Sequence, residues 1–134
     1  MNSEESIKEL IDSFYQIISG RAQEERNWDN FRNLFFENGH LMSIKLNDNK
    51  ECISKPMNIE AYILILDKFL KTIDFYEYGL NYKINIMRNI ADVYSEYEAK
   101  NSLEEEPIKK GVNLVHLVND GHRWRILNML WQDQ

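Results

Sequence analysis

The sequence is poor in the residues that mark disulfide-rich and metal-binding proteins. It contains one cysteine, Cys52, and three histidines. A lone cysteine forms no internal disulfide, so we expect a protein of the reducing cytoplasm. The cysteine and the histidines show neither C-x-x-C nor H-x-x-x-H spacing, and a metal site is therefore not predicted.

Glycine, proline and long apolar runs are scarce as well. The five glycines do not cluster, which excludes a phosphate-binding loop and a dinucleotide motif, so no cofactor is expected. No run approaches the ~18 apolar residues of a membrane-spanning helix, and the polar, acidic N-terminus lacks the pattern of a secretory signal. The net charge of −6 disfavours nucleic acid and anionic membranes as partners.

The remaining composition is that of an ordinary globular chain. Hydrophobic residues make up 43% and charged residues 28% of the sequence. A length of 134 residues corresponds to one domain with one core, and no linker or repeat divides it. We therefore expect a single domain over residues 1–134.

The first half of the chain has the pattern of helices. Residues 7–18 carry apolar side chains at helical spacing, after Asn2 as a cap and before Gly20 as an end. A second helix is predicted from Asn27 to Gly39, and a third begins after Asn58. Short strands are expected between them, over residues 40–46 and 50–55.

The second half has the pattern of four consecutive strands. They are predicted over residues 75–87, 90–99, 111–119 and 123–132, and Asp120-Gly121 is a strong hairpin signal between the last two. With Asn119 opposite His122, the register would set Arg125 opposite His116 and Asn128 opposite Asn113. Helices that precede a run of hairpins favour an α+β fold in which the helices cover one face of an antiparallel sheet.

The same period-two counting assigns the faces of these strands. Residues 78, 80, 82, 84 and 86 share one apolar face. Trp124 and Trp131 are seven positions apart and fall on opposite faces, unless a bulge intervenes. Apolar residues on both faces of the last strand imply that both faces are covered, which predicts a homodimer through the outer face.

Three stretches resemble the nuclear transport factor 2-like superfamily, and within it the SnoaL-like and ketosteroid-isomerase-like proteins. They are residues 28–35 (WDNFRNLF), residues 89–98 (NIADVYSEYE) and the terminal hairpin of residues 111–131, with Gly121, Trp124 and Ile126. The resemblance implies one SnoaL-like domain with a cystatin-like α+β barrel. In that fold, a cone-shaped curved antiparallel sheet wraps around three helices and leaves a pocket at its open end.

The ketosteroid isomerase mechanism does not carry over to this sequence. In such enzymes an aspartate base follows the second helix, and alignment of residues 34–40 sets Ser43 at that position. Serine does not replace a carboxylate base. Tyr15 lies one or two positions from the tyrosine that those enzymes carry on the first helix.

His116 is the best acid–base candidate in the sequence, because the ordinary pKa of histidine lies near ~6.5. The alternative is a histidine that is hydrogen-bonded in the core or at the dimer face. Asp92, Tyr94, Glu96 and Glu98 share one strand face, which we interpret as solvated, with Val93 and Tyr97 buried on the other. Predicted ligand-binding residues are Tyr15, Trp28, Phe31, Tyr94, Glu96, Asn113, Asn128 and Trp131.

Two functions remain open. The first is a homodimeric protein that binds a small apolar molecule with a few polar groups. Its enzymatic form would be cofactor-independent acid–base chemistry of the isomerase, cyclase or dehydratase type. The second is a non-catalytic dimerisation or protein-binding module. A cavity with a perturbed His116 or an inward carboxylate favours the first, and a cavity filled by Trp28, Phe31, Phe69 and Trp131 favours the second.

Overall fold

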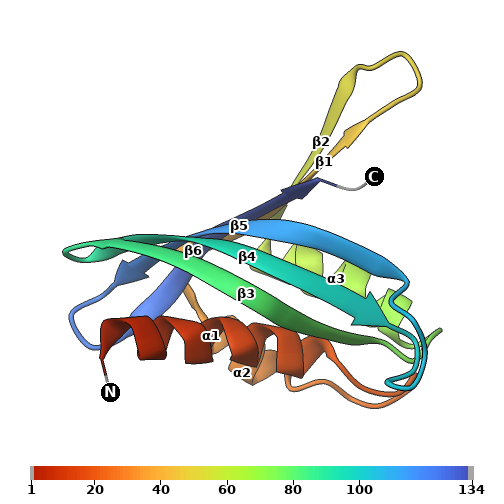
Figure 1. Ribbon diagram of the computed structural model, residues 1–134, viewed down its shortest axis with the longest axis horizontal. Helices are drawn as coiled ribbons and strands as arrows, with labels where there is room; N and C mark the ends of the chain where they lie inside the picture. The colour runs from red at the N-terminus through yellow and green to blue at the C-terminus, as the bar shows by residue number, and fades with distance from the viewer. Residues whose placement is uncertain (1, 133–134) are drawn as a thin grey trace.

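The computed structural model describes residues 2–132 and has three helices and six strands over that range (Figure 1). The elements are α1 (Ser3–Ile18), α2 (Trp28–Asn33), β1 (Phe35–Leu46), β2 (Cys52–Asn58), α3 (Ile59–Leu70), β3 (Tyr76–Met87), β4 (Ile90–Lys100), β5 (Lys109–Asn119) and β6 (Trp124–Gln132).

All six strands belong to one curved, unclosed sheet in the order β2-β1-β6-β5-β4-β3. Every neighbouring pair is antiparallel except β1 and β6, which run parallel. The helices lie on one side of this sheet, with α1 along β3 to β6 (Figure 1). The α+β prediction is confirmed, and the parallel contact between β1 and β6 is an addition to it.

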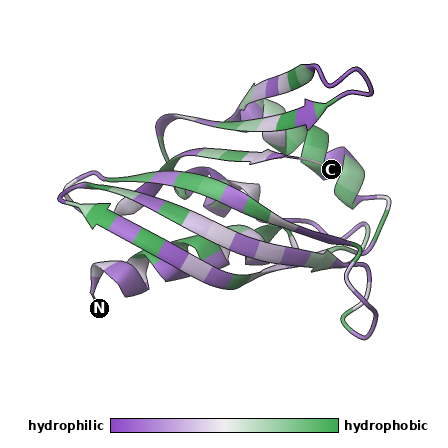
Figure 2. Ribbon diagram, turned by 45° about the horizontal axis from the view of Figure 1, so that its top comes forward, coloured by the Kyte–Doolittle hydropathy of each residue, from purple (hydrophilic) through white to green (hydrophobic). Residues whose placement is uncertain are grey.

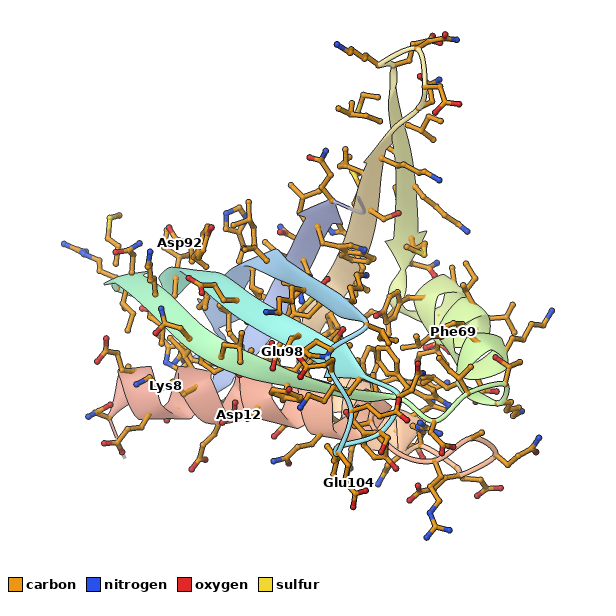
Figure 3. The ribbon with its side chains drawn as sticks, turned by 45° about the vertical axis from the view of Figure 1, so that its right-hand side comes forward. Lys8, Asp12, Phe69, Asp92, Glu98 and Glu104 are labelled. Carbon is orange, nitrogen blue, oxygen red and sulfur yellow. The ribbon has the colours of Figure 1, made fainter. Side chains whose placement is uncertain are left out.

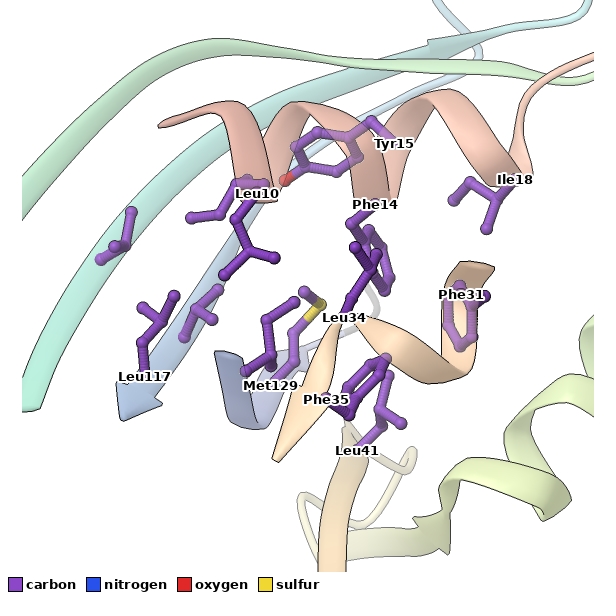
Figure 4. Packing of buried hydrophobic residues seen from close by; sticks show 14 of the residues in the cluster. Leu10, Phe14, Tyr15, Ile18, Phe31, Leu34, Phe35, Leu41, Leu117 and Met129 are labelled. Atoms are coloured by element: carbon purple, nitrogen blue, oxygen red, sulfur yellow. The ribbon is translucent and has the colours of Figure 1, made fainter. Parts of the chain in front are cut away.

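Asparagine side chains begin all three helices, as predicted. The side-chain oxygens of Asn2, Asn27 and Asn58 accept hydrogen bonds from main-chain N–H groups three residues further on, at 2.8–3.0 Å. Such caps satisfy donors that have no partner within the helix. The apolar stripe of α1 then packs on the sheet and forms the centre of the core with residues from α2 and β1 (Figure 4).

The central strands alternate strictly between core and surface. In β4, Ala91, Val93, Ser95, Tyr97 and Ala99 are buried, whereas Asp92 and Tyr94 between them are exposed. The prediction that Val93 and Tyr97 form the buried set is therefore confirmed. Figure 2 shows this alternation as bands of hydrophobic and hydrophilic residues along the strands, and Figure 3 shows Asp92 on the side of the sheet away from α1.

A longer turn between β5 and β6 and a β-bulge in β6 together change the predicted register. Asn119 pairs with Trp124 and His116 pairs with Asn128, and the register shifts between His116 and Leu117. The predicted pairs, Arg125 with His116 and Asn128 with Asn113, are therefore wrong. The extra residue of a bulge also exchanges the two faces of the sheet to which the following side chains of that strand point.

The bulge in β6 is the exception that the prediction for the two tryptophans allowed. Trp124 is buried, and Trp131 packs against the same core from a position opposite the buried Asn113. The two indoles thus lie on the same face of the sheet. Opposite faces were predicted for an uninterrupted strand.

A second bulge lies in β3. Its register against β4 shifts between Gly79 and Asn81. Glu77 stands opposite the buried Ala99, and Tyr82 stands opposite the buried Ser95. The inner face of β3 therefore begins with Glu77 and Gly79 and continues with Tyr82, so the prediction of one face for residues 78–86 is wrong.

The hairpin of β1 and β2 projects beyond the rest of the sheet (Figure 1). β1 begins at Phe35, five residues before the predicted strand. The second helix is shorter than predicted, since α2 ends at Asn33 and Gly39 lies within β1. The Ile126 N–H donates to the Leu34 carbonyl at 2.8 Å and thus joins the start of β1 to β6. β2 pairs only with β1 and is an edge of the sheet.

Candidate functional site

A cavity of about 610 Å³ opens between the inner face of the sheet and helices α1 and α3. This volume lies within the ~300–1,000 Å³ that is usual for small-molecule sites. Aromatic and aliphatic side chains dominate its wall, and Glu77, Lys109 and Asn113 are polar groups among them. Its aromatic members are Phe14, Tyr62, Phe69, Phe75, Tyr97 and Trp131.

The end of α1 fixes the main chain of Glu77. The Ser19 hydroxyl accepts a hydrogen bond from the Glu77 N–H at 2.9 Å and lies 3.1 Å from the Glu77 carbonyl oxygen. Beside this contact, Gly20 and Phe75 exchange two main-chain hydrogen bonds of 2.8 and 2.9 Å. The first residues of β3 are thereby held against α1, and the Glu77 side chain is presented to the cavity.

Burial changes the acidity of Glu77. Removal of the carboxylate from water disfavours its charged form and raises the pKa of Glu77 to about 7, whereas the positive charge of Lys109 acts in the opposite direction. Lys109 stands on the far side of Ala99 in the same cross-strand row, and its ammonium lies 5.8 Å from the centre of the Tyr97 ring. Desolvation therefore outweighs the lysine, and Glu77 titrates near neutral pH.

A buried polar cluster lies deeper under the sheet. The Tyr15 hydroxyl is 2.6 Å from the Ser95 hydroxyl and accepts a hydrogen bond of 3.1 Å from the Asn113 amide. Tyr15 is 2% exposed, and burial raises its pKa well above the ordinary value. These three groups satisfy one another, as buried polar groups require.

Of the predicted ligand-binding residues, Asn113 and Trp131 line the cavity. Tyr15 and Phe31 are buried in the core, and Phe31 stacks on Tyr62 with ring centres 5.8 Å apart. Trp28 packs edge-on against Phe31 and donates its indole N–H to Asp67 at 3.2 Å. Tyr15, Phe31 and Trp28 therefore stand behind the cavity wall and are not part of it.

The other predicted residues lie on the outer face of the sheet. His116 is exposed there, directly between Asp92 on β4 and Asn128 on β6 in a cross-strand row. Tyr94 and Glu96 occupy outer positions of β4. The structure thus brings His116 and Asn128 together, whereas a separation of three positions was predicted, and it sets both apart from the cavity.

Several cavity residues escaped the sequence analysis, above all Glu77. The predicted apolar face of residues 78, 80, 82, 84 and 86 does not include Glu77. The available signal was Gly79, because a glycine within a strand often marks a bulge. When the alternation of side chains is counted from Gly79, Glu77 falls on the inner face of the sheet. Lys109 was missed because the strand was predicted to begin at residue 111, whereas β5 begins at Lys109.

Two further observations concern residues 2–132. No group of three or more His, Cys, Asp or Glu side chains within that range is arranged to hold a metal ion. None of the helices described is long and apolar enough to cross a membrane.

Comparison with known proteins identifies the fold. Neither a protein family model nor a curated protein sequence matches the chain. Solved structures do match, among them a protein of unknown function with a cystatin-like fold from Nostoc punctiforme. The TM-score is 0.73 at 14% identity over 96% of this chain and 89% of that one.

Two similar structures come from Novosphingobium aromaticivorans. One is an NTF2-like protein with a cystatin-like fold, with a TM-score of 0.70 and 12% identity over 97% of this chain and 80% of that one. The other is proposed to be a scytalone dehydratase, with a TM-score of 0.69 and 15% identity over 96% and 81%. The chain therefore has the cystatin-like fold of NTF2-like proteins, in agreement with the resemblance of its sequence.

Proposed function

We propose that this protein binds a small, largely apolar molecule in the cavity between the sheet and helices α1 and α3. The observation that carries the proposal is the cavity itself, which has an apolar wall and a few polar groups at fixed positions. A wall of this kind provides binding energy through burial and specificity through the polar groups. Trp28 and Phe31 do not fill the space, and this favours ligand binding over a purely structural role.

The comparisons support this proposal at the level of fold. One similar protein is proposed to be a dehydratase, so the same architecture is associated with small-molecule chemistry in that protein. Acid–base chemistry in this chain would fall to Glu77, which lines the cavity, in preference to His116 on the outer face. A carboxyl with a pKa of about 7 exchanges protons near neutral pH.

A neutral aromatic probe tests the binding proposal. We expect 2-(1-naphthyl)ethanol to bind with one-to-one stoichiometry in isothermal titration calorimetry. Leu66 lines the cavity from α3, so Leu66→Trp should fill part of the space and weaken binding by roughly tenfold or more.

The matched control lies on the same helix. Leu64 is 64% exposed and is not part of the cavity wall, so Leu64→Trp adds the same side chain without blocking the space. Its affinity for the alcohol should equal that of the native protein. Absence of binding to the native protein, or equal losses in both variants, would contradict the proposed site.

We also propose a homodimer through the outer face of the sheet. Exposed apolar side chains gather there from β4, β5 and β6, including Ile90, Tyr94, Leu114 and Leu130. Ile44 extends this apolar surface onto the projecting hairpin, since it lines the same shallow hollow as Tyr94, Leu114 and Leu130. Such a face is self-complementary in a two-fold dimer, because each copy offers the same strands.

A further inference from the structure

The Glu77 carboxylate lacks a hydrogen-bond donor among residues 2–132. Its main chain is clamped by Ser19, but none of the described side chains donates to the carboxylate. Glu77 is half-buried, and a carboxylate that is partly withdrawn from water is ordinarily paired or hydrogen-bonded, because loss of hydration is costly. The cavity therefore contains a fixed acceptor that is available to a ligand.

We propose that Glu77 makes the cavity selective for apolar molecules that carry a protonated amine. This inference rests on the proposed function and adds the chemical class of the ligand. An ammonium group would donate charge-assisted hydrogen bonds to Glu77, while its apolar body would lie against the aromatic wall. Charge-assisted bonds are about twice as strong as neutral ones.

The aromatic wall favours a cation as well. Phe75 lies two residues before Glu77, and Tyr97 lines the cavity from the neighbouring strand. The faces of such rings attract ammonium groups within about 6 Å of the ring centre. The net charge of −6 further attracts cations to the molecule as a whole.

Lys109 does not remove the preference of the cavity for a protonated amine. Its charge lowers the pKa of Glu77, but the pKa still stands at about 7, so Lys109 compensates only part of the desolvation. Other titratable groups around the cavity are Tyr15 from α1, Tyr62 from α3, Tyr97 from β4 and Lys110 from β5. Lys110 lies 4.0 Å from Glu98, and burial raises the pKa of Tyr15, so that Tyr15 stays neutral near pH 7.

The test compares two probes of nearly the same shape, 2-(1-naphthyl)ethylamine and 2-(1-naphthyl)ethanol. At pH 8 the amine is protonated and Glu77 is mostly ionised. Calorimetry should then give an affinity for the amine roughly tenfold above that for the alcohol. At pH 6, where the carboxyl is mostly protonated, most of this preference should disappear, and the affinity for the alcohol should stay constant.

Glu77→Gln should abolish most of the amine preference at pH 8, so that the ratio of the two affinities falls close to one. Glu9→Gln removes an exposed carboxylate from α1 and changes the net charge equally, so it should retain the preference. The pH dependence of the native protein is a second measurement that needs no variant.

Each outcome has a distinct meaning. Equal affinities for amine and alcohol in the native protein at pH 8, or an amine preference that persists in Glu77→Gln, overturn the role of Glu77 while the cavity remains a binding site. If neither probe binds the native protein, the proposed function fails, and the amine selectivity fails with it.

Discussion

Single residues in this protein owe their chemistry to their position on the inner or outer face of the sheet. Glu77 and Glu98 are both carboxylates on neighbouring strands. Glu98 accepts a short hydrogen bond of 2.5 Å from Tyr78 on the outer face, whereas Glu77 faces an apolar cavity. The raised pKa of Glu77 follows from desolvation, and Glu77 thereby becomes a group that destabilises the fold when it is charged.

Glu77→Gln should therefore stabilise the protein in a pH-dependent manner. The folded pKa of about 7 exceeds the ordinary value of 4.5, so the folded state favours the protonated carboxyl. The native protein retains the full contribution of the protonated form below pH 4.5 and loses it as the pH rises to 7. Urea unfolding at pH 8 should show the variant more stable by up to about 3 kcal/mol, and at pH 4.5 the difference should nearly vanish.

The control for this measurement is Glu9→Gln. It removes an exposed carboxylate and should change the free energy of unfolding by less than about 0.5 kcal/mol at either pH. A stability gain for Glu77→Gln that is the same at pH 4.5 and pH 8 would show that desolvation of the charge is not its cause.

At the scale of secondary structure, both bulges act on the cavity. The bulge in β3 brings Glu77 and Gly79 to the inner face, and the bulge in β6 brings Trp131 to the same face as Trp124. Without them, strict alternation would send Glu77 and Trp131 to the outer surface. Two side chains of the cavity wall, the polar Glu77 and the aromatic Trp131, thus owe their positions to these two bulges.

The Tyr82 ring covers Gly79 beside the first of these bulges. A methyl group at position 79 would overlap the ring, so Gly79→Ala must displace it. The ring is held in place because its hydroxyl lies 2.5 Å from an Asp12 carboxylate oxygen. We expect Gly79→Ala to lower the free energy of unfolding by about 1–3 kcal/mol in urea titrations.

A double-mutant cycle separates overlap from other effects of the new methyl group. In a Tyr82→Ala background the ring is absent, and Gly79→Ala should then be nearly neutral. Leu80→Ala, at an exposed residue of the same bulge, should change stability by less than about 0.5 kcal/mol. An equal loss for Gly79→Ala with and without the ring would refute this account of Gly79.

The sequence predicted the order of elements, the helix caps and the fold class, because these depend on local signals. Asn2, Asn27 and Asn58 each reveal a helix start through residues only three positions away. The cavity was predicted less well, because its membership depends on strand faces, and one inserted residue inverts a face. Glu77 reaches the inner face because of the bulge in β3, whereas the face of His116 was undetermined because its neighbours in β5 are apolar on both sides.

At the scale of the whole molecule, the sheet separates two surfaces with different properties. Its inner face carries the core and the cavity, and its outer face carries exposed apolar residues around a polar row with Asp92, His116 and Asn128. Four strands of about ten residues cover roughly 600 Å² in projection. This approaches the ~800 Å² per partner of a standard interface, so the outer face is large enough to join two copies.

The dimer prediction can be tested at the centre of this face. Leu114 on β5 is 46% exposed and stands between Tyr94 on β4 and Leu130 on β6. Sedimentation velocity of the native protein at micromolar concentration should give about twice the monomer mass. Leu114→Glu buries a charge in the two-fold contact, once from each copy, and should shift the protein to monomer.

Leu64→Glu alters an exposed leucine on α3, away from the sheet face, and should remain dimeric. A native protein that sediments as a monomer, or a Leu114→Glu variant that dimerises as well as Leu64→Glu, would exclude the outer face as the interface.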